Sequence, residues 1–245
     1  MRFLIKFSYD GTNYYGLQTQ KGKRTIQEEM ENALTKVNNN QKTNLVATGR
    51  TDKGVHAKEQ FAHADINVSI TEKKLKRALN SNLPDDIHVI ETKIVDDNFH
   101  ARYNVKEKEY QYLINTGEYN PLERNYVFQY NYELNIDKMK SAIKYFLGTH
   151  DFRSFVTDNK EKTNCIRTIT KAEIKQNGKK IIISFRGDGF LRYQVRNMVG
   201  LLIKIGENKI SQEDVEKIID AKDRTKASKT APPEGLYLVN VKYNK

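Results

Sequence analysis

Eight residues at positions 49–56, GRTDKGVH, bring together an acid, two cations, a histidine and two glycines. Asp52 lies between Arg50 and Lys53, and such neighbours keep a carboxylate in its charged form. The same cations attract a phosphate backbone. An ionised acid in this setting can act as a nucleophile or a base on a polyanionic substrate. The competing interpretation is an ordinary turn, since Asp is common two positions before a glycine such as Gly54.

Two histidines, one in this stretch and one beyond it, raise the question of a metal site. His56 and His63 are seven residues apart, and the sequence has neither an HExxH motif nor paired cysteines, because Cys165 is its single cysteine. Packed or hydrogen-bonded histidines are the favoured interpretation, and we expect no metal. A P-loop, G-x-G-x-x-G and a G-x-S-x-G elbow are also missing. We therefore expect neither a nucleotide cofactor nor a serine nucleophile.

Aromatic and basic residues elsewhere suit an RNA substrate. Tyr110 and Tyr112 in EKEYQYLIN fall on the same face of a predicted strand. Either can stack on a base, or both can belong to the core. Arg192 and Arg196 lie one helical turn apart in FLRYQVRNMVG. They are either solvated surface charges or a pair of which one binds a carboxylate, for which the planar guanidinium is well suited.

The composition favours a polyanionic partner. The 245 residues carry 42 Lys and Arg against 31 Asp and Glu, a net charge of +11. Nucleic acid is the expected partner, although such a charge can also serve solubility alone. The N-terminal residues lack a signal-peptide cleavage site, and no apolar run reaches the length of a membrane span. With one cysteine, these features predict a soluble protein of the reducing cytoplasm, with no membrane partner.

The elements that position these residues follow one order twice. Alternating or helical hydrophobic spacing predicts strands and helices in the order β-α-β-β-α-β in the first half, over residues 2–10, 25–37, 44–48, 59–68, 71–83 and 87–95. Thr25 is the expected cap of the first helix, with Glu28 as its capping-box partner. The loop of Asp52 then joins the second and third strands, where loops on a rigid sheet often carry function.

The second half repeats this order with one added helix. The predicted elements are a strand at 107–115, a helix at 135–148, a hairpin about Asn177 and Gly178, helices at 190–206 and 211–221, and a closing strand at 235–243. Ser211 is the expected cap of the last helix. We therefore predict an α+β fold of two ferredoxin-like (RRM-like) half-domains, residues 1–103 and 104–245, with mainly antiparallel sheets and helices on one face.

Beyond these patterns, GRTDKGVHA resembles the active-site signature of the TruA family of tRNA pseudouridine synthases. Further blocks resemble this family in the same order and extend along almost the whole chain: YDGTNYYG with the following TIQ, NFHARYNVKEKEYQY, GTHDFRSF, the RTI after Cys165, GFLRYQVRNMVG and APPEGLYLVNVKY. So many ordered blocks make a chance similarity implausible.

The resemblance implies roles for individual residues. It assigns Asp52 as the catalytic aspartate, Tyr110 as the tyrosine that stacks on the target uracil, and Arg196 as the arginine that pairs with the catalytic carboxylate. Arg50 lies beside Asp52 in the motif and joins the substrate-binding residues. The resemblance further implies an isomerase that needs no cofactor, and a homodimer that binds the anticodon stem-loop of tRNA and modifies uridines at tRNA positions 38–40.

Two departures from the family pattern bear on RNA contacts. Leu17 stands where the family usually has tryptophan, and Tyr193 stands where it often has histidine. Neither changes the expected reaction, but both leave the target nucleotide open. Three alternatives also stay open at this stage: a relative that acts on ribosomal RNA, a non-catalytic RNA-binding module and a metal-assisted nuclease. For the synthase, attack at the ribose C1′, attack at the uracil C6 and removal of a ribose proton are equally compatible with Asp52.

Overall fold

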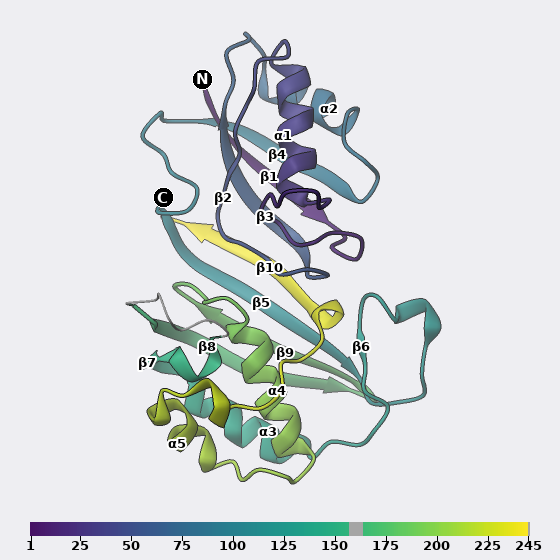
Figure 1. The fold of residues 1–245 in the computed structure, drawn as a ribbon, viewed down its shortest axis with the longest axis vertical. Coiled ribbons are helices and arrows are strands. Elements are labelled where there is room, and N and C mark those ends of the chain that lie inside the picture. The colour runs from purple at the N-terminus through teal and green to yellow at the C-terminus, as the bar shows by residue number, and fades with distance from the viewer. Residues whose placement is uncertain (157–163, 245) are drawn as a thin grey trace. The chain divides into compact units, whose positions relative to one another are not determined.

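A computed structural model describes residues 1–156 and 164–244. The chain forms two compact units, drawn in Figure 1. The first unit holds Met1–Lys106 together with the residues from Tyr237 onward, and the second holds Glu107–Leu236. The last strand of the chain is therefore part of the first unit. The half-domain boundary expected between residues 103 and 104 stays a prediction.

The first unit is a sheet with two helices. Its elements are β1 (Arg2–Tyr9), α1 (Ile26–Val37), β2 (Val46–Ala47), β3 (His56–Asp65), α2 (Glu72–Asn80), β4 (Ile87–Val95) and β10 (Leu236–Tyr243). β1 pairs with β3 and with β4, and β2 pairs with β3, all antiparallel. β10 runs parallel to β3, with Tyr237 opposite His56. The first six elements follow the β-α-β-β-α-β order that the sequence predicts.

Local sequence explains these elements. In β1 the apolar residues alternate, so Phe3, Ile5 and Phe7 are fully buried while the residues between them are partly exposed. The side chain of Thr25 accepts a hydrogen bond from the backbone N–H of Glu28 and caps α1, as expected. Figure 1 shows α1 and α2 side by side.

The second unit has more irregular connections. Its elements are β5 (Val105–Asn115), η1 (Pro121–Glu123), β6 (Phe128–Gln129), α3 (Ile136–Ala142), η2 (Ile143–Phe146), β7 (Gly148–Asp151), η3 (Phe152–Phe155), β8 (Ile166–Asn177), β9 (Lys180–Gly187), α4 (Gln194–Gly206), α5 (Asp214–Ala221), η4 (Arg224–Lys226) and η5 (Pro233–Gly235). β9 lies between β5 and β8 in antiparallel pairing, and β8 pairs with β7. β6 runs parallel to β5. The predicted hairpin is confirmed, with Asn177 opposite Lys180 and Gly178 at φ 57°.

In the second unit, three helix boundaries differ from the prediction. The helix expected from residue 135 is α-helical only to Ala142 and continues as the tighter η2. The helix expected from residue 190 begins at Gln194, because Tyr193 has a left-handed φ of 62° that a helix cannot include. The predicted cap Ser211 is wrong: the N-cap of α5 is Glu213, and the hydroxyl of Ser211 donates to the carboxylate of Glu213.

In residues 1–156 and 164–244, no helix combines the length and the apolar character that crossing a membrane requires.

Candidate active site

The loop between β2 and β3 carries Asp52. It ends in a turn in which the backbone N–H of Val55 donates to the carbonyl of Asp52 over 3.2 Å, and Gly54 has φ 77°. The left-handed φ explains the glycine at this position. Asp52 is half-buried, whereas Arg50 and Lys53 are exposed. The loop therefore presents a carboxylate and two cations next to the ordered end of a strand.

Two glycines of residues 9–16 let this segment lie directly against the loop. A Cβ atom on Gly11 would lie 2.0 Å from the carbonyl oxygen of Val55, and one on Gly16 would lie 2.7 Å from that of Thr51. Gly16 also has φ 98°, which disfavours any other residue. The segment YDGTNYYG is thus the support on which the Asp52 loop is built.

The residue after this segment is Leu17, one of the two departures from the family pattern. It is 2% exposed. Its backbone N–H donates to the carbonyl of Thr51 over 3.2 Å, and its own carbonyl accepts from Gln27 over 2.9 Å. Leu17 therefore belongs to the packing beneath the loop.

His56 and His63 are both packed within the first unit. The Nδ1 atom of His56 lies 3.1 Å from the donating backbone N–H of Gly11, and the ring stacks on Tyr237 at 4.7 Å between centroids. Nδ1 of His63 accepts from the backbone N–H of Ala101 over 3.0 Å, and burial lowers the pKa of His63 to about 4. Each imidazole is used structurally, as the favoured interpretation predicts. Among residues 1–156 and 164–244, no three His, Cys, Asp or Glu side chains are grouped as a metal site would need.

The tyrosines of β5 share one face, as the alternation predicts, but differ in their surroundings. Tyr112 is fully buried and donates its hydroxyl to the carbonyl of Pro232 over 2.8 Å. Burial raises its pKa well above the usual value. Tyr110 keeps 8% of its surface exposed and meets the ring of Phe190 edge-on, 5.2 Å between centroids. Tyr112 is therefore a core residue, and Tyr110 is the better candidate for a stacking role.

Arg196 lies on the first turn of α4 and is held by the segment before β10. Its Nε donates to the carbonyl of Ala231 over 2.8 Å, and the backbone N–H of Ala231 donates back to the carbonyl of Arg196 over 3.1 Å. The guanidinium carbon also lies 5.2 Å from the ring centroid of Tyr193. These contacts fix the plane of the guanidinium, which is the property that pairing with a carboxylate requires.

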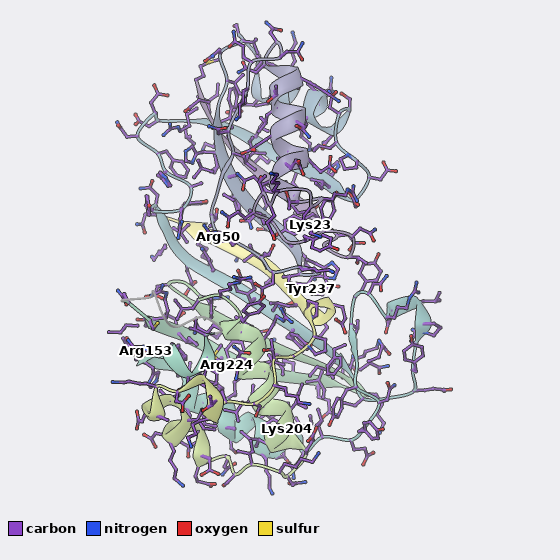
Figure 2. All side chains as sticks on the ribbon, viewed as in Figure 1. Lys23, Arg50, Arg153, Lys204, Arg224 and Tyr237 are labelled. Atoms are coloured by element: carbon purple, nitrogen blue, oxygen red, sulfur yellow. The ribbon has the colours of Figure 1, made fainter. Side chains whose placement is uncertain are left out.

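The segment before β10 also contacts α4 further along the helix. A Cβ on Gly200 would lie 2.0 Å from the carbonyl oxygen of Lys229, so only glycine allows the two backbones to approach this closely. Arg224, labelled in Figure 2, donates to the side-chain oxygen of Asn197 over 3.0 Å. Thr230 donates to the same oxygen over 2.6 Å. We name residues 228–235 the α4 strap.

The α4 strap also contains an acidic side chain, Glu234, whose pKa is shifted by burial. Burial raises the pKa of Glu234, and the positive charge of Arg196 opposes this shift. The strap thus brings the carboxyl group of Glu234 into the electrostatic environment of Arg196.

The predicted site residues divide between the units. Asp52 and Arg50 belong to the first unit, and Tyr110 and Arg196 to the second. The two hydrogen bonds between the backbone of Ala231 and Arg196 are not predictable from the sequence. Backbone contacts leave no residue-type signal, and the only trace in the sequence is that a small apolar residue precedes two prolines.

Comparison with known proteins places these features in a wider context. A family model described as tRNA pseudouridine synthase matches residues 5–104 and 142–244. The matched ranges include Arg50, Asp52 and Arg196, whereas Tyr110 lies between them.

Individual relatives match over nearly the full length. A protein of Limosilactobacillus reuteri (strain DSM 20016) named tRNA pseudouridine synthase A is 43% identical, over 99% of this chain and 96% of the relative. Proteins with the same name from Pseudothermotoga lettingae and Thermoanaerobacter pseudethanolicus are each 46% identical, over 99% and 98% of both chains respectively. Among solved structures, a chain of a Cbf5-Nop10-Gar1 complex is 13% identical over 82% of this chain and 54% of its own, with a TM-score of 0.36, and this likeness supports no argument.

Proposed function

The chain belongs to the tRNA pseudouridine synthase family, and from this premise we propose that it modifies uridines 38–40 of the tRNA anticodon arm with Asp52 as its catalytic carboxylate. It is an isomerase that converts uridine to pseudouridine in tRNA. The observation that carries this conclusion is identity of 43–46% with relatives of that name over 98–99% of the chain.

The reaction moves the uracil from an N-glycosidic to a C-glycosidic bond. The C1′–N1 bond breaks, the uracil rotates, C5 bonds to C1′, the proton of C5 leaves and N1 gains a proton, so no electron acceptor is needed. Asp52 begins the reaction by attack at C1′, by attack at C6, or by removal of a ribose proton. The target uridine must first leave its stack, which costs a few kcal/mol and least where the base is unpaired.

The other site residues hold the substrate and the acid. Tyr110 stacks on the target uracil, and such stacking contributes ~1–3 kcal/mol. Its support is a ring that meets Phe190 edge-on in a residue that keeps 8% of its surface exposed. Arg196 pairs with the catalytic carboxylate, and its support is the guanidinium plane fixed by Ala231. Arg50, exposed and two residues before Asp52, binds RNA phosphate.

We also propose that the fold consists of two ferredoxin-like half-domains, residues 1–103 and 104–245. The support in the first half is the element order and the antiparallel pairing of β1 with both β3 and β4. In the second half it is the antiparallel pairing of β9 with β5 and β8.

The assembly is proposed to be a cytoplasmic homodimer. The segment between β5 and α3 exposes several large apolar side chains, which a second copy could cover: Tyr119, Leu122, Tyr126 and Tyr132. Sedimentation of the purified protein tests this, since a monomer at micromolar concentration would contradict it.

The decisive experiment replaces the acid and follows both chemistry and binding. Asp52→Asn should abolish pseudouridine formation in a tRNA transcript and leave tRNA affinity within about twofold, because the amide keeps the shape of the side chain but cannot act as nucleophile or base. Asp85→Asn, an exposed aspartate of the same unit, is the matched control and should retain activity. Turnover by Asp52→Asn above a few per cent, or product in the wild type outside positions 38–40, would overturn the corresponding part of the proposal.

A further inference from the structure

Three side chains form an exposed cluster next to the Asp52 loop. The Nζ atom of Lys53 lies 4.2 Å from the ring centroid of Tyr15, and that of Lys23, labelled in Figure 2, lies 4.6 Å from the same centroid. Tyr15 is 40% exposed, and both lysines are exposed. We name these three residues the Tyr15 cluster.

The backbone around the Tyr15 cluster is ordered. The N–H of Tyr15 donates to the carbonyl of Arg24 over 3.0 Å, and the N–H of Lys23 donates to the carbonyl of Gln20 over 3.1 Å. On the other side, Gly16 packs against the backbone of the Asp52 loop, where its added Cβ would lie 3.3 Å from the N atom of Lys53. The two ammonium groups therefore converge from separate, fixed segments.

The charges of this cluster are not balanced by acids of the protein. In the part of the chain that the structure describes, neither Lys23 nor Lys53 forms an ion pair with a carboxylate. The neighbouring Arg24 behaves differently, since it pairs with Glu29 over 2.9 Å and with Asp86 over 3.0 Å. Two ammonium groups at one ring repel each other, and the ring offsets this only in part. An anion bound next to both ammonium groups would offset the repulsion.

We propose that the Tyr15 cluster binds a phosphodiester group of the RNA strand next to the flipped uridine. This inference rests on the proposed function, since Lys53 is adjacent to Asp52 and a nucleotide held there places its neighbouring phosphates at the loop. The ring of Tyr15 holds the two lysines together, and the lysines supply the charge that neutralises the phosphate. The cluster is a binding site and takes no part in bond breaking.

Charge removal tests the site, with a matched control in the same unit. Lys23→Gln and Lys53→Gln should each raise the KM for tRNA about fivefold, the equivalent of one charge-assisted contact. Each should also lower the slope of log Kd against log salt by about 0.7, the value for one phosphate of a single strand. Lys73→Gln, which removes an exposed charge from α2, should change neither quantity. Equal effects in all three variants would show a general charge effect and overturn the site.

The ring provides a second, independent measurement. Tyr15→Phe keeps the aromatic face and should leave KM within about twofold, whereas Tyr15→Leu should raise it as the lysine variants do. Equal KM values for Tyr15→Phe and Tyr15→Leu would contradict the role of the ring. The salt slope is measured by binding alone, so it still reports on the cluster if the wild-type protein forms no pseudouridine, an outcome that would refute only the proposed function.

Discussion

Tyr110 and Tyr112 stand two residues apart on the same face of β5; Tyr112 is fully buried, whereas Tyr110 keeps 8% of its surface exposed. A tyrosine that stacks on uracil and guides the removal of the C5 proton needs its hydroxyl, whereas stacking needs only the ring. The stacking proposed for Tyr110 and a further role in removing the C5 proton can therefore be separated by removing one oxygen atom.

We predict that Tyr110→Phe lowers kcat about 100-fold, as expected for loss of a proton-transferring group, with tRNA affinity nearly unchanged. Tyr112→Phe is the matched control. It loses a buried hydrogen bond to Pro232 and should reduce the free energy of unfolding by about 1 kcal/mol without a comparable loss of kcat. Single-turnover kinetics and urea unfolding measure the two effects. An unchanged kcat in Tyr110→Phe would leave only stacking as its role.

His63 gives the unfolding free energy a defined pH dependence. Its pKa falls from 6.5 in the unfolded chain to about 4 in the folded protein, mainly because of burial and then because of the charge of Arg2. The unfolded state therefore binds more protons between these values, and the stabilisation present above pH 6.5 is lost as the pH falls towards 4. In His63→Asn the amide oxygen can still accept from Ala101. Urea unfolding from pH 7 to 4.5 should show a smaller loss in this variant than in the wild type, and parallel curves would contradict the assignment.

Single residues differ in how far the sequence identifies them. Asp52 could be proposed as an ionised acid from the sequence, because a carboxylate beside two cations has a recognisable chemistry. Tyr110 and Tyr112 were equivalent by alternation, and only their burial separates them. Ala231 acts through its backbone, so no choice of side chain marks it. Whether Asp52, Tyr110 and Arg196 act together is a prediction that the variants above test.

At the scale of elements, the loop of Asp52 depends on the segment beneath it. Gly16 and Gly22 both have left-handed φ angles, 98° and 69°, so an alanine at either position pays a similar backbone cost of ~1 kcal/mol. The two positions differ in the room for a methyl group. A Cβ on Gly16 would lie 2.7 Å from the carbonyl oxygen of Thr51, whereas a Cβ on Gly22 would have no heavy atom of the described residues within 4 Å, apart from its chain neighbours. Comparing alanine variants at these two positions therefore separates the effect of backbone strain from the effect of displacing the loop.

We predict that Gly16→Ala lowers both the free energy of unfolding and kcat, because the added methyl group pushes the loop away. Gly22→Ala should lower the free energy of unfolding only by the cost of the left-handed backbone. It should keep kcat within about twofold. Thermal unfolding and single-turnover rates on one tRNA transcript measure both. If the two variants have the same kcat, the contact between Gly16 and the loop is dispensable for catalysis.

Helices and strands were predictable where the local spacing of apolar and capping residues determines them. β4 spans the predicted residues 87–95, and the cap of α1 is Thr25 as expected, since both depend on local spacing. The start of α4 was not predictable, because the left-handed Tyr193 is a non-glycine residue and carries no sequence signal. The two-residue strand β6 escaped prediction for another reason. It is defined by pairing with β5, a contact between segments distant in sequence.

At the scale of the whole molecule, the net charge of +11 predicts the salt dependence of tRNA binding. If six or more phosphates are neutralised, raising the salt from 50 to 200 mM should weaken the affinity about 1,000-fold or more. Asp52→Asn protein allows the measurement on unmodified tRNA without turnover. An affinity that changes less than about tenfold would mean that few phosphates are contacted.

The parallel pairing of β10 with β3 has a consequence for how the protein is made. Tyr237 stacks on His56, directly after the Asp52 loop, although about 180 residues of chain separate them. Closing so long a chain is slow compared with local pairing. During synthesis on the ribosome, residues 1–106 emerge early, but His56 has its stacking partner only after β10 has been made. A nascent chain that stops at residue 236 therefore carries the Asp52 loop without the stacking of Tyr237 on His56 beside it.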